Sequence, residues 1–150
     1  MTSEKDRAWR ASHRMVVGIA SRLNRELIRV AGLSLPDYEV LSTLAGTPNG
    51  MLRAYELGAD LQWEKSRLSH HLKRMSNRGL IDRVACESDG RGLWVALTAA
   101  GRDALQRAAL VHDALIGDLL AIEAEGLQTL AEVSEKVVAA MPEGGDLCDS

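Results

Sequence analysis

The chain has 150 residues, of which 46% are hydrophobic and 26% are charged, and its formal net charge is −3. This composition is typical of one soluble globular domain, and no apolar run approaches the roughly 20 residues that a membrane-spanning helix needs. The N-terminus has no apolar signal core, and the two cysteines give no disulfide framework. A core without Phe must be built from Leu, Ala, Val and Met, which favours helices. We therefore expect a single, mainly helical domain in the cytoplasm.

The charge is unevenly distributed along the chain. Residues 1–34 carry seven basic and three acidic side chains, and residues 62–100 carry seven and four. Residues 35–61 and 101–150 have net charges of −3 and −7. Phosphate binding requires a local basic face rather than a basic total, so these numbers permit nucleic-acid binding. They also argue that the C-terminal third does not touch a nucleic acid.

The first predicted element is a helix over residues 5–31. Apolar residues recur there at spacings of three and four, and five arginines occupy much of the other face. A second helix begins after Ser34, a suitable N-cap, with Asp37 three residues later in a variant of the capping box. After a turn at residues 47–50, a third short helix is predicted over residues 52–60.

The central stretch combines a basic helix with a hairpin. Residues 64–78 are strongly basic and carry an apolar stripe at helical spacing, formed by Leu68, Leu72 and Met75. Two short apolar runs follow, residues 80–86 and 93–97, on either side of a polar turn that contains glycine. A basic helix followed by a hairpin with an arginine near its tip is typical of a winged helix-turn-helix module that binds DNA.

Helical spacing returns after Gly101 and continues to Met141, with a break predicted at Gly126. Pro142 then ends the helix, and residues 142–150 are expected to form a flexible tail. These helices carry more apolar surface than one small DNA-binding module can cover. Together with the first helix they indicate a dimerisation layer, in which each protomer buries the other's excess.

At this point the sequence resembles the MarR (multiple antibiotic resistance regulator) family of transcription factors over nearly its whole length. The residues that carry the resemblance are Lys65-Ser66-Arg67-Leu68-Ser69, Asn77-Arg78-Gly79-Leu80-Ile81, Asp89-Gly90-Arg91, Val95-Ala96-Leu97-Thr98 and Gly101-Arg102. Each motif alone is weak, and their joint occurrence at the family's spacing is strong. The sequence departs from the family at Gln62, where a Gly is usual, and at Glu64, where a Ser or Thr cap is usual. Gln62 either lies in a different turn or adopts a positive φ.

The resemblance implies a fold that is mainly α with a small β-hairpin (α+β). A winged helix-turn-helix lobe would occupy about residues 34–99, and dimerisation helices about residues 5–33 and 100–141. It further implies a homodimer that binds palindromic operators in double-stranded DNA, usually represses transcription, and is often released by a small-molecule ligand.

The apolar stripe of the basic helix determines which side chains are free to contact DNA. Arg67 and His70 lie near the start of the helix and are the best candidates for base edges in the major groove. Short or flexible side chains suit phosphates or nearby bases, and Arg53 could clamp the backbone at another rim. The remaining candidates on this helix are Lys65, Ser66, Ser69, Lys73 and Arg74. For each of them, the alternative is a solvated polar side chain.

In the wing, Asp89 and Arg91 are two residues apart and can face the same side of a tight turn. The resemblance implies that Asp89 orients an arginine that enters the minor groove, and narrow A·T-rich grooves attract arginine strongly. We assign that role to Arg91. Arg83, on the first strand of the hairpin, is a further candidate for a phosphate contact.

Other polar residues receive more modest assignments. His71 lies between Leu68 and Met75 on the inner side of its helix, so we expect a partly buried structural histidine. The family's architecture implies an effector pocket that involves Trp9, His13, Tyr38 and His112. No spacing of His, Cys and acidic residues resembles a metal site, and no cofactor is expected. Cys86 is expected to be inert, with a redox switch as the alternative.

Two other classes of protein compete with a DNA-binding regulator. Ser69-His70-His71 offers a nucleophile and a base, but neighbours on a helix point about 100° apart and no acid is placed to orient them, so an enzyme is not expected. The second rival is a winged-helix module that serves only protein–protein contacts. The response of binding to salt separates the two, because phosphate neutralisation weakens as salt rises.

Overall fold

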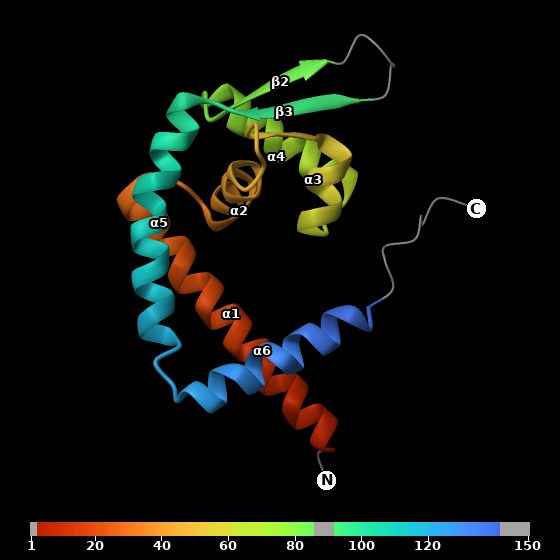
Figure 1. Ribbon diagram of the computed structural model, residues 1–150, viewed down its shortest axis with the longest axis vertical. Helices are drawn as coiled ribbons and strands as arrows, with labels where there is room; N and C mark the ends of the chain where they lie inside the picture. Colours follow the sequence, from red (N-terminus) through yellow and green to blue (C-terminus); the bar gives the residue numbers. More distant parts are fainter. Residues whose placement is uncertain (1–2, 86–91, 142–150) are drawn as a thin grey trace, which may run out of the picture. The chain divides into compact units, whose positions relative to one another are not determined.

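The computed structural model describes residues 3–85 and 92–141, and Figure 1 shows the order of its elements along the chain. They are α1 (Glu4–Ala31), α2 (Leu35–Ala45), β1 (Met51–Arg53), α3 (Ala54–Leu61), α4 (Lys65–Asn77), β2 (Ile81–Ala85), β3 (Leu93–Leu97), α5 (Ala99–Leu119) and α6 (Ala124–Ala139). The chain divides into two units, residues 1–115 and residues 116–150. The predicted fold class, mainly α with a small β-hairpin, is confirmed. None of the described helices is long and apolar enough to cross a membrane.

The junction between α1 and α2 forms as the sequence predicts. Gly32 adopts a left-handed conformation (φ 67°) that ends α1. Ser34 then caps α2, because its Oγ accepts from the Asp37 N–H at 3.1 Å while Asp37 Oδ2 accepts from the Ser34 N–H at 2.9 Å. The Leu35 N–H donates to Asn24 Oδ1 at 2.8 Å and fixes the start of α2 beside α1. These contacts set the position of α2 within the first unit.

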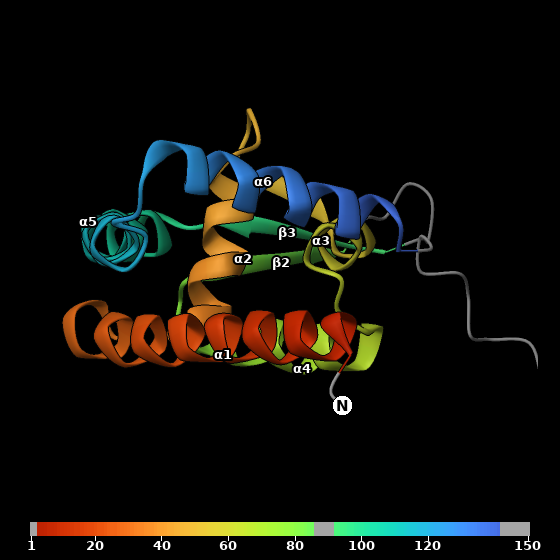
Figure 2. The ribbon, with the colours of Figure 1, turned by 90° about the horizontal axis from the view of Figure 1, so that it is seen from below.

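The core of the first unit lies around α2. This helix contacts α1 on one side and strands β1 and β3 on another, and Figure 2 shows it from below. Its buried residues Leu41 and Leu44 form the core together with apolar side chains from α1, α3, α4 and the sheet, which include Leu27, Leu57, Leu72, Met75, Ile81 and Val95. Gly58 is buried in α3, and a Cβ there would lie 3.2 Å from Leu68 Cδ2, so the absence of a side chain lets α4 pack closely against α3.

The sheet has one strand more than the sequence predicts. Its order is β1-β3-β2, and both pairs are antiparallel. Residues 52 and 53 were expected to start the third helix, but they pair with Val95 and Trp94 of β3. The backbone partners offered by β3 outweigh the local helical preference, and α3 therefore begins at Ala54, with the Arg53 N–H donating to Glu56 Oε2 at 2.9 Å.

The sequence places the break in the C-terminal helices wrongly. The predicted break at Gly126 lies inside the first turn of α6, and the two helices are separated at residues 120–123 instead. Glycine is tolerated there because the first backbone N–H groups of a helix have no intrahelical partner. Glu123 takes the extended N-cap conformation. None of the 16 residues of α6 is buried.

Candidate nucleic-acid interface

Helix α4 is sharply divided between a buried and an exposed side. Its inward residues are Leu68, His71, Leu72 and Met75. Its sequence contains no acidic residue, and seven of the predicted DNA contacts on it are exposed: Lys65, Ser66, Arg67, Ser69, His70, Lys73 and Arg74. The exposed side is therefore a continuous set of hydrogen-bond donors with positive charge, which is suited to phosphate oxygens and to the acceptors of base edges.

The exposed residues are not equivalent in direction. At about 100° per residue, Ser66, His70 and Lys73 lie opposite the buried stripe. Arg67 and Arg74 lie to one side, on the same flank as His71. The structure thus distinguishes a central row on α4 from a flank that carries two arginines.

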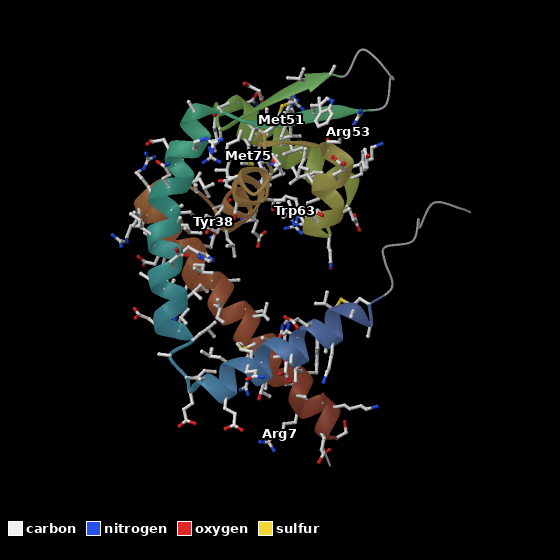
Figure 3. All side chains as sticks on the ribbon, viewed as in Figure 1. Arg7, Tyr38, Met51, Arg53, Trp63 and Met75 are labelled. Atoms are coloured by element: carbon white, nitrogen blue, oxygen red, sulfur yellow. The ribbon has the colours of Figure 1, made fainter. Side chains whose placement is uncertain are left out.

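On this flank, Arg67 stacks on an aromatic ring. Its guanidinium carbon lies 4.2 Å from the centre of the Trp63 ring. Trp63 follows Gln62, which adopts a left-handed conformation (φ 54°, ψ 41°) at the end of α3. The second alternative for Gln62, a positive φ, is therefore confirmed. The Trp63 backbone N–H donates to the Gly58 carbonyl at 3.0 Å, so this turn fixes the position of the backbone from which the indole extends. Figure 3 labels Trp63.

His71 is buried, as expected, and it connects both arginines of the flank to the core. Its ring meets the Trp63 ring edge-on at 5.3 Å between centroids. Arg74 Nη2 lies 3.1 Å from His71 Nδ1. A guanidinium can only donate, so Nδ1 must be the acceptor and the ring proton is on Nε2. Nε2 in turn lies 2.9 Å from Oδ1 of Asp37.

Asp37 is the buried anchor of α4. Arg78, which follows the last residue of α4, donates to Asp37 Oδ2 at 2.8 Å and to the Gly32 carbonyl at 2.7 Å. Burial alone would raise the pKa of Asp37, but the close approach of His71 Nε2 and the hydrogen bonds from Arg78 and the Ser34 N–H hold that pKa well below its usual range. One carboxylate thus links the start of α2 to the middle and the end of α4, and Arg78 extends this link to Gly32 at the end of α1.

A second arginine–tryptophan pair lies at the rim formed by the sheet. Arg53 and Trp94 are cross-strand partners, and the guanidinium carbon of Arg53 lies 4.7 Å from the centre of the Trp94 ring. Figure 3 labels Arg53 at this position. Arg83 is exposed on β2. The predicted wing residues Asp89 and Arg91, and also Cys86, lie outside the described residues.

The four candidate ligand contacts form two separate pairs. Tyr38 of α2 and His112 of α5 are stacked with centroids 4.7 Å apart. Burial raises the pKa of Tyr38, and the nearby negative charge of Asp113 adds to this effect. Trp9 and His13 also stack, at 5.4 Å, on the exposed N-terminal half of α1. Trp9 lies about 22 Å along α1 from Asn24, which touches the start of α2, so the two pairs are well apart.

Among residues 3–85 and 92–141, no group of three His, Cys, Asp or Glu side chains could hold a metal ion.

The sequence did not predict the role of Trp63, and it indicated Asp37 only as part of a helix cap. The signal for Trp63 was its position directly after Gln62, where the chain departs from its family pattern.

Comparisons with known proteins point to one family. Residues 31–92 match the model described as the MarR family. The DNA-bound structure of Sco3205, a MarR family transcriptional regulator from Streptomyces coelicolor, is 31% identical, with 98% of this chain and 94% of that chain covered and a TM-score of 0.89. AbsC, a MarR family transcriptional regulator from the same organism, is 28% identical, with 93% and 95% covered and a TM-score of 0.84. No curated protein sequence matches the chain.

A third structure shares the fold at lower identity. The PcaV transcriptional regulator of Streptomyces coelicolor, in complex with its natural ligand, is 22% identical, with 93% of this chain and 94% of that chain covered and a TM-score of 0.73.

Proposed function

The chain belongs to the MarR family of transcriptional regulators, and on that basis we propose that it binds a palindromic site in double-stranded DNA as a homodimer. In each protomer, α4 would enter the major groove and Arg91 of the wing would enter the minor groove. The winged helix-turn-helix lobe comprises about residues 34–99, and dimerisation involves about residues 5–33 and 100–141. We propose that the protein acts as a repressor in the cytoplasm, with no catalytic activity.

The observation that carries this proposal is the exposed side of α4. Four basic residues lie on it without an acidic residue on the same helix, in a protein whose net charge is −3. The remaining contacts follow from their positions. His70 and Arg67 read bases, Ser66 and Ser69 contact phosphate or base edges, and phosphates are held by Lys65, Lys73, Arg74, Arg53 and Arg83.

Exposed apolar side chains support the homodimer. On α1 they include Trp9, Met15, Val16 and Val17, and on α6 they include Leu127, Val133, Val137 and Val138. Apolar surface of this extent on a regulator is usually covered by a partner, and a two-fold dimer is the commonest solution. Two-fold symmetry in the protein then requires a palindromic site in the DNA.

The Tyr38–His112 stack supports one candidate place for an effector. The Tyr38–His112 stack joins α2 to α5 and presents two aromatic rings, which suits a small aromatic or lipophilic molecule. We propose that such a ligand releases the protein from DNA. Trp9 and His13 are kept as the second, separate candidate contact on α1.

DNA binding is tested by selecting sites from a pool of random-sequence duplexes and measuring their affinity in a salt series. The logarithm of the affinity should fall linearly with the logarithm of the salt concentration, since each neutralised phosphate releases counterions. A flat salt response would instead favour the runner-up, a winged-helix module for protein–protein contacts. Sedimentation at micromolar concentration should show a dimer, and a clean monomer would contradict the palindromic site.

Repression is tested separately in cells. A reporter gene that carries a selected site next to its promoter should be expressed less when the protein is present. Increased expression would show an activator.

A further inference from the structure

Trp63 lies in the short connection between α3 and α4, outside the exposed side of α4. Its ring is nevertheless in contact with that side, through the Arg67 guanidinium 4.2 Å above it. Two interactions hold the tryptophan itself: its backbone N–H donates to the Gly58 carbonyl, and His71 packs edge-on against its ring. Because His71 is buried against Asp37, the ring is supported by the core rather than by solvent-exposed contacts.

We propose that Trp63 is a positioning residue for DNA recognition, which holds the Arg67 side chain in the orientation that reads a base. The inference rests on the proposed function, because it needs α4 in the major groove. A free arginine side chain has many rotamers, and fixing them on binding lowers affinity. A ring that restricts Arg67 before DNA arrives removes part of that cost.

The stacking geometry leaves the reading groups of Arg67 available. Cation–π stacking uses the flat face of the guanidinium, while its five N–H groups point outward in the plane. Two of these N–H groups in a fixed fork match O6 and N7 of guanine. Trp63 can therefore hold Arg67 without competing for its donors.

Glu39 of α2 is the acidic group that acts on Arg67 from the neighbouring element. Burial raises the pKa of Glu39, and the positive charge of Arg67 opposes that effect. The attraction between the Glu39 carboxylate and Arg67 could draw the arginine away from the groove. The Trp63 ring provides a neutral alternative contact, which leaves the guanidinium uncommitted to an ion pair.

The experiment is a double-mutant cycle with Trp63→Leu and Arg67→Ala. The probe is a 30-base-pair duplex, about three helical turns, that carries the sequence selected by the wild-type protein. Trp63→Leu should weaken binding to this probe about three- to tenfold, in line with the cost of ordering one flexible side chain. It should change binding to a scrambled duplex little. In the Arg67→Ala background, Trp63→Leu should have no further effect.

Two further variants control for folding and chemistry. Trp63→Phe keeps an aromatic face and should restore most of the affinity. Trp63→Met fills the space without a ring and replaces Trp63→Leu in the cycle if the leucine variant unfolds at a lower temperature. In nuclear magnetic resonance spectra, the Arg67 Hε signal should lose its ring-current shift in Trp63→Leu.

Several results would overturn the inference while leaving DNA binding intact. An equal loss in the wild-type and Arg67→Ala backgrounds would assign Trp63 a structural role alone. Tighter binding by Trp63→Leu would mean that the ring withholds Arg67 from DNA. An unchanged Arg67 Hε signal would mean that the stack does not form. If the wild-type protein selects no sequence at all, the proposed function fails, and this inference fails with it.

Discussion

His71 Nε2 and Asp37 Oδ1 lie 2.9 Å apart and join the middle of α4 to the first turn of α2. Asp37 is only 2% exposed, and its other carboxylate oxygen accepts from Arg78 at the end of α4. Helix α4 is therefore attached to the core at two points by one charged group. Such a charge stabilises the fold only while its partners remain in place.

Asp37→Asn is expected to destabilise the protein by about 2–3 kcal/mol, because the amide removes the buried negative charge and keeps only one acceptor oxygen, so an NH2 donor faces either Arg78 or His71. Urea unfolding measures the change. Asp6→Asn, which removes an exposed pair with Arg10, is the matched control and should cost less than about 0.5 kcal/mol. Similar losses of stability in both variants would show that the buried Asp37 carboxylate contributes no more to stability than an exposed one.

Acid should destabilise the protein through Asp37. Its pKa is depressed in the folded state, so its contribution is fully present above the unfolded value of about 3.9 and is lost as pH falls toward the folded pKa. Urea unfolding between about pH 6 and pH 3 should therefore show a smaller loss in Asp37→Asn than in the wild type.

Glu39 provides the control of opposite sign. Because burial raises its pKa, the folded state takes up its proton first and gains stability as pH falls. Glu39→Gln should make the acid loss steeper, and parallel curves for all three proteins would contradict both assignments.

Gln62→Gly is expected to stabilise the protein by about 1 kcal/mol, because a residue with a Cβ is strained in the left-handed region. Thermal or urea unfolding measures the gain. Gln62→Ala keeps the strain and should change stability little. Gln106→Gly, at an exposed position inside α5, should lower stability by a similar amount. A loss on Gln62→Gly would mean that the glutamine side chain has a stabilising contact of its own.

Two glycines inside helices should respond to alanine in opposite ways. A Cβ at Gly101 would overlap the carbonyl oxygen of Leu80, so Gly101→Ala should cost at least about 3 kcal/mol. A Cβ at Gly18 meets no atom within 4 Å, so Gly18→Ala should raise stability by about 0.5–1 kcal/mol. Unfolding midpoints of the two variants provide the test, and a tolerated Gly101→Ala would refute the close approach of α5 to Leu80.

Substitutions on α4 should separate base reading from phosphate contact. Arg67→Ala should lose about 1–3 kcal/mol on the selected site and flatten the preference at one position. Lys73→Ala should weaken all duplexes about equally and reduce the salt slope by about one. Gel-shift titrations with single-base variants of the site distinguish the two patterns. If the wild type and Arg67→Ala discriminate equally between the single-base variants, Arg67 does not read a base.

The helices were predictable because their signals are local. The capping box of Ser34 and Asp37 marks the start of α2, and the stripe from Leu68 to Met75 identifies the inner side of α4. Strand β1 was not predictable, since three residues are too short for an alternating pattern and their partners in β3 are more than 40 positions away. The break before α6 was misplaced because Gly126, which lies in the first turn of α6, has the low helix propensity that usually indicates the end of a helix.

The sequence predicted which residues of the site are exposed, but it did not predict the contacts that hold these residues and their helix in place. Arg67 was identified from its place on the helix, whereas its contact with Trp63 depends on the left-handed Gln62, which turns the chain between α3 and α4. Asp37 and Arg78 are 41 residues apart, and only the packing of α2 against α4 brings them together. Supports of this kind follow from the tertiary arrangement and leave no periodic pattern in the sequence.

Helix α6 has 16 residues and buries none of them. A helix of this length is marginal alone in water, so a second copy that covers it would also supply much of its order. Assembly then obeys mass action, and well below the dimer dissociation constant the occupancy of a DNA site rises with the square of the monomer concentration. A twofold change in gene dosage would change occupancy about fourfold in that range. The bare surface of α6 would thus make the regulator sensitive to its own abundance.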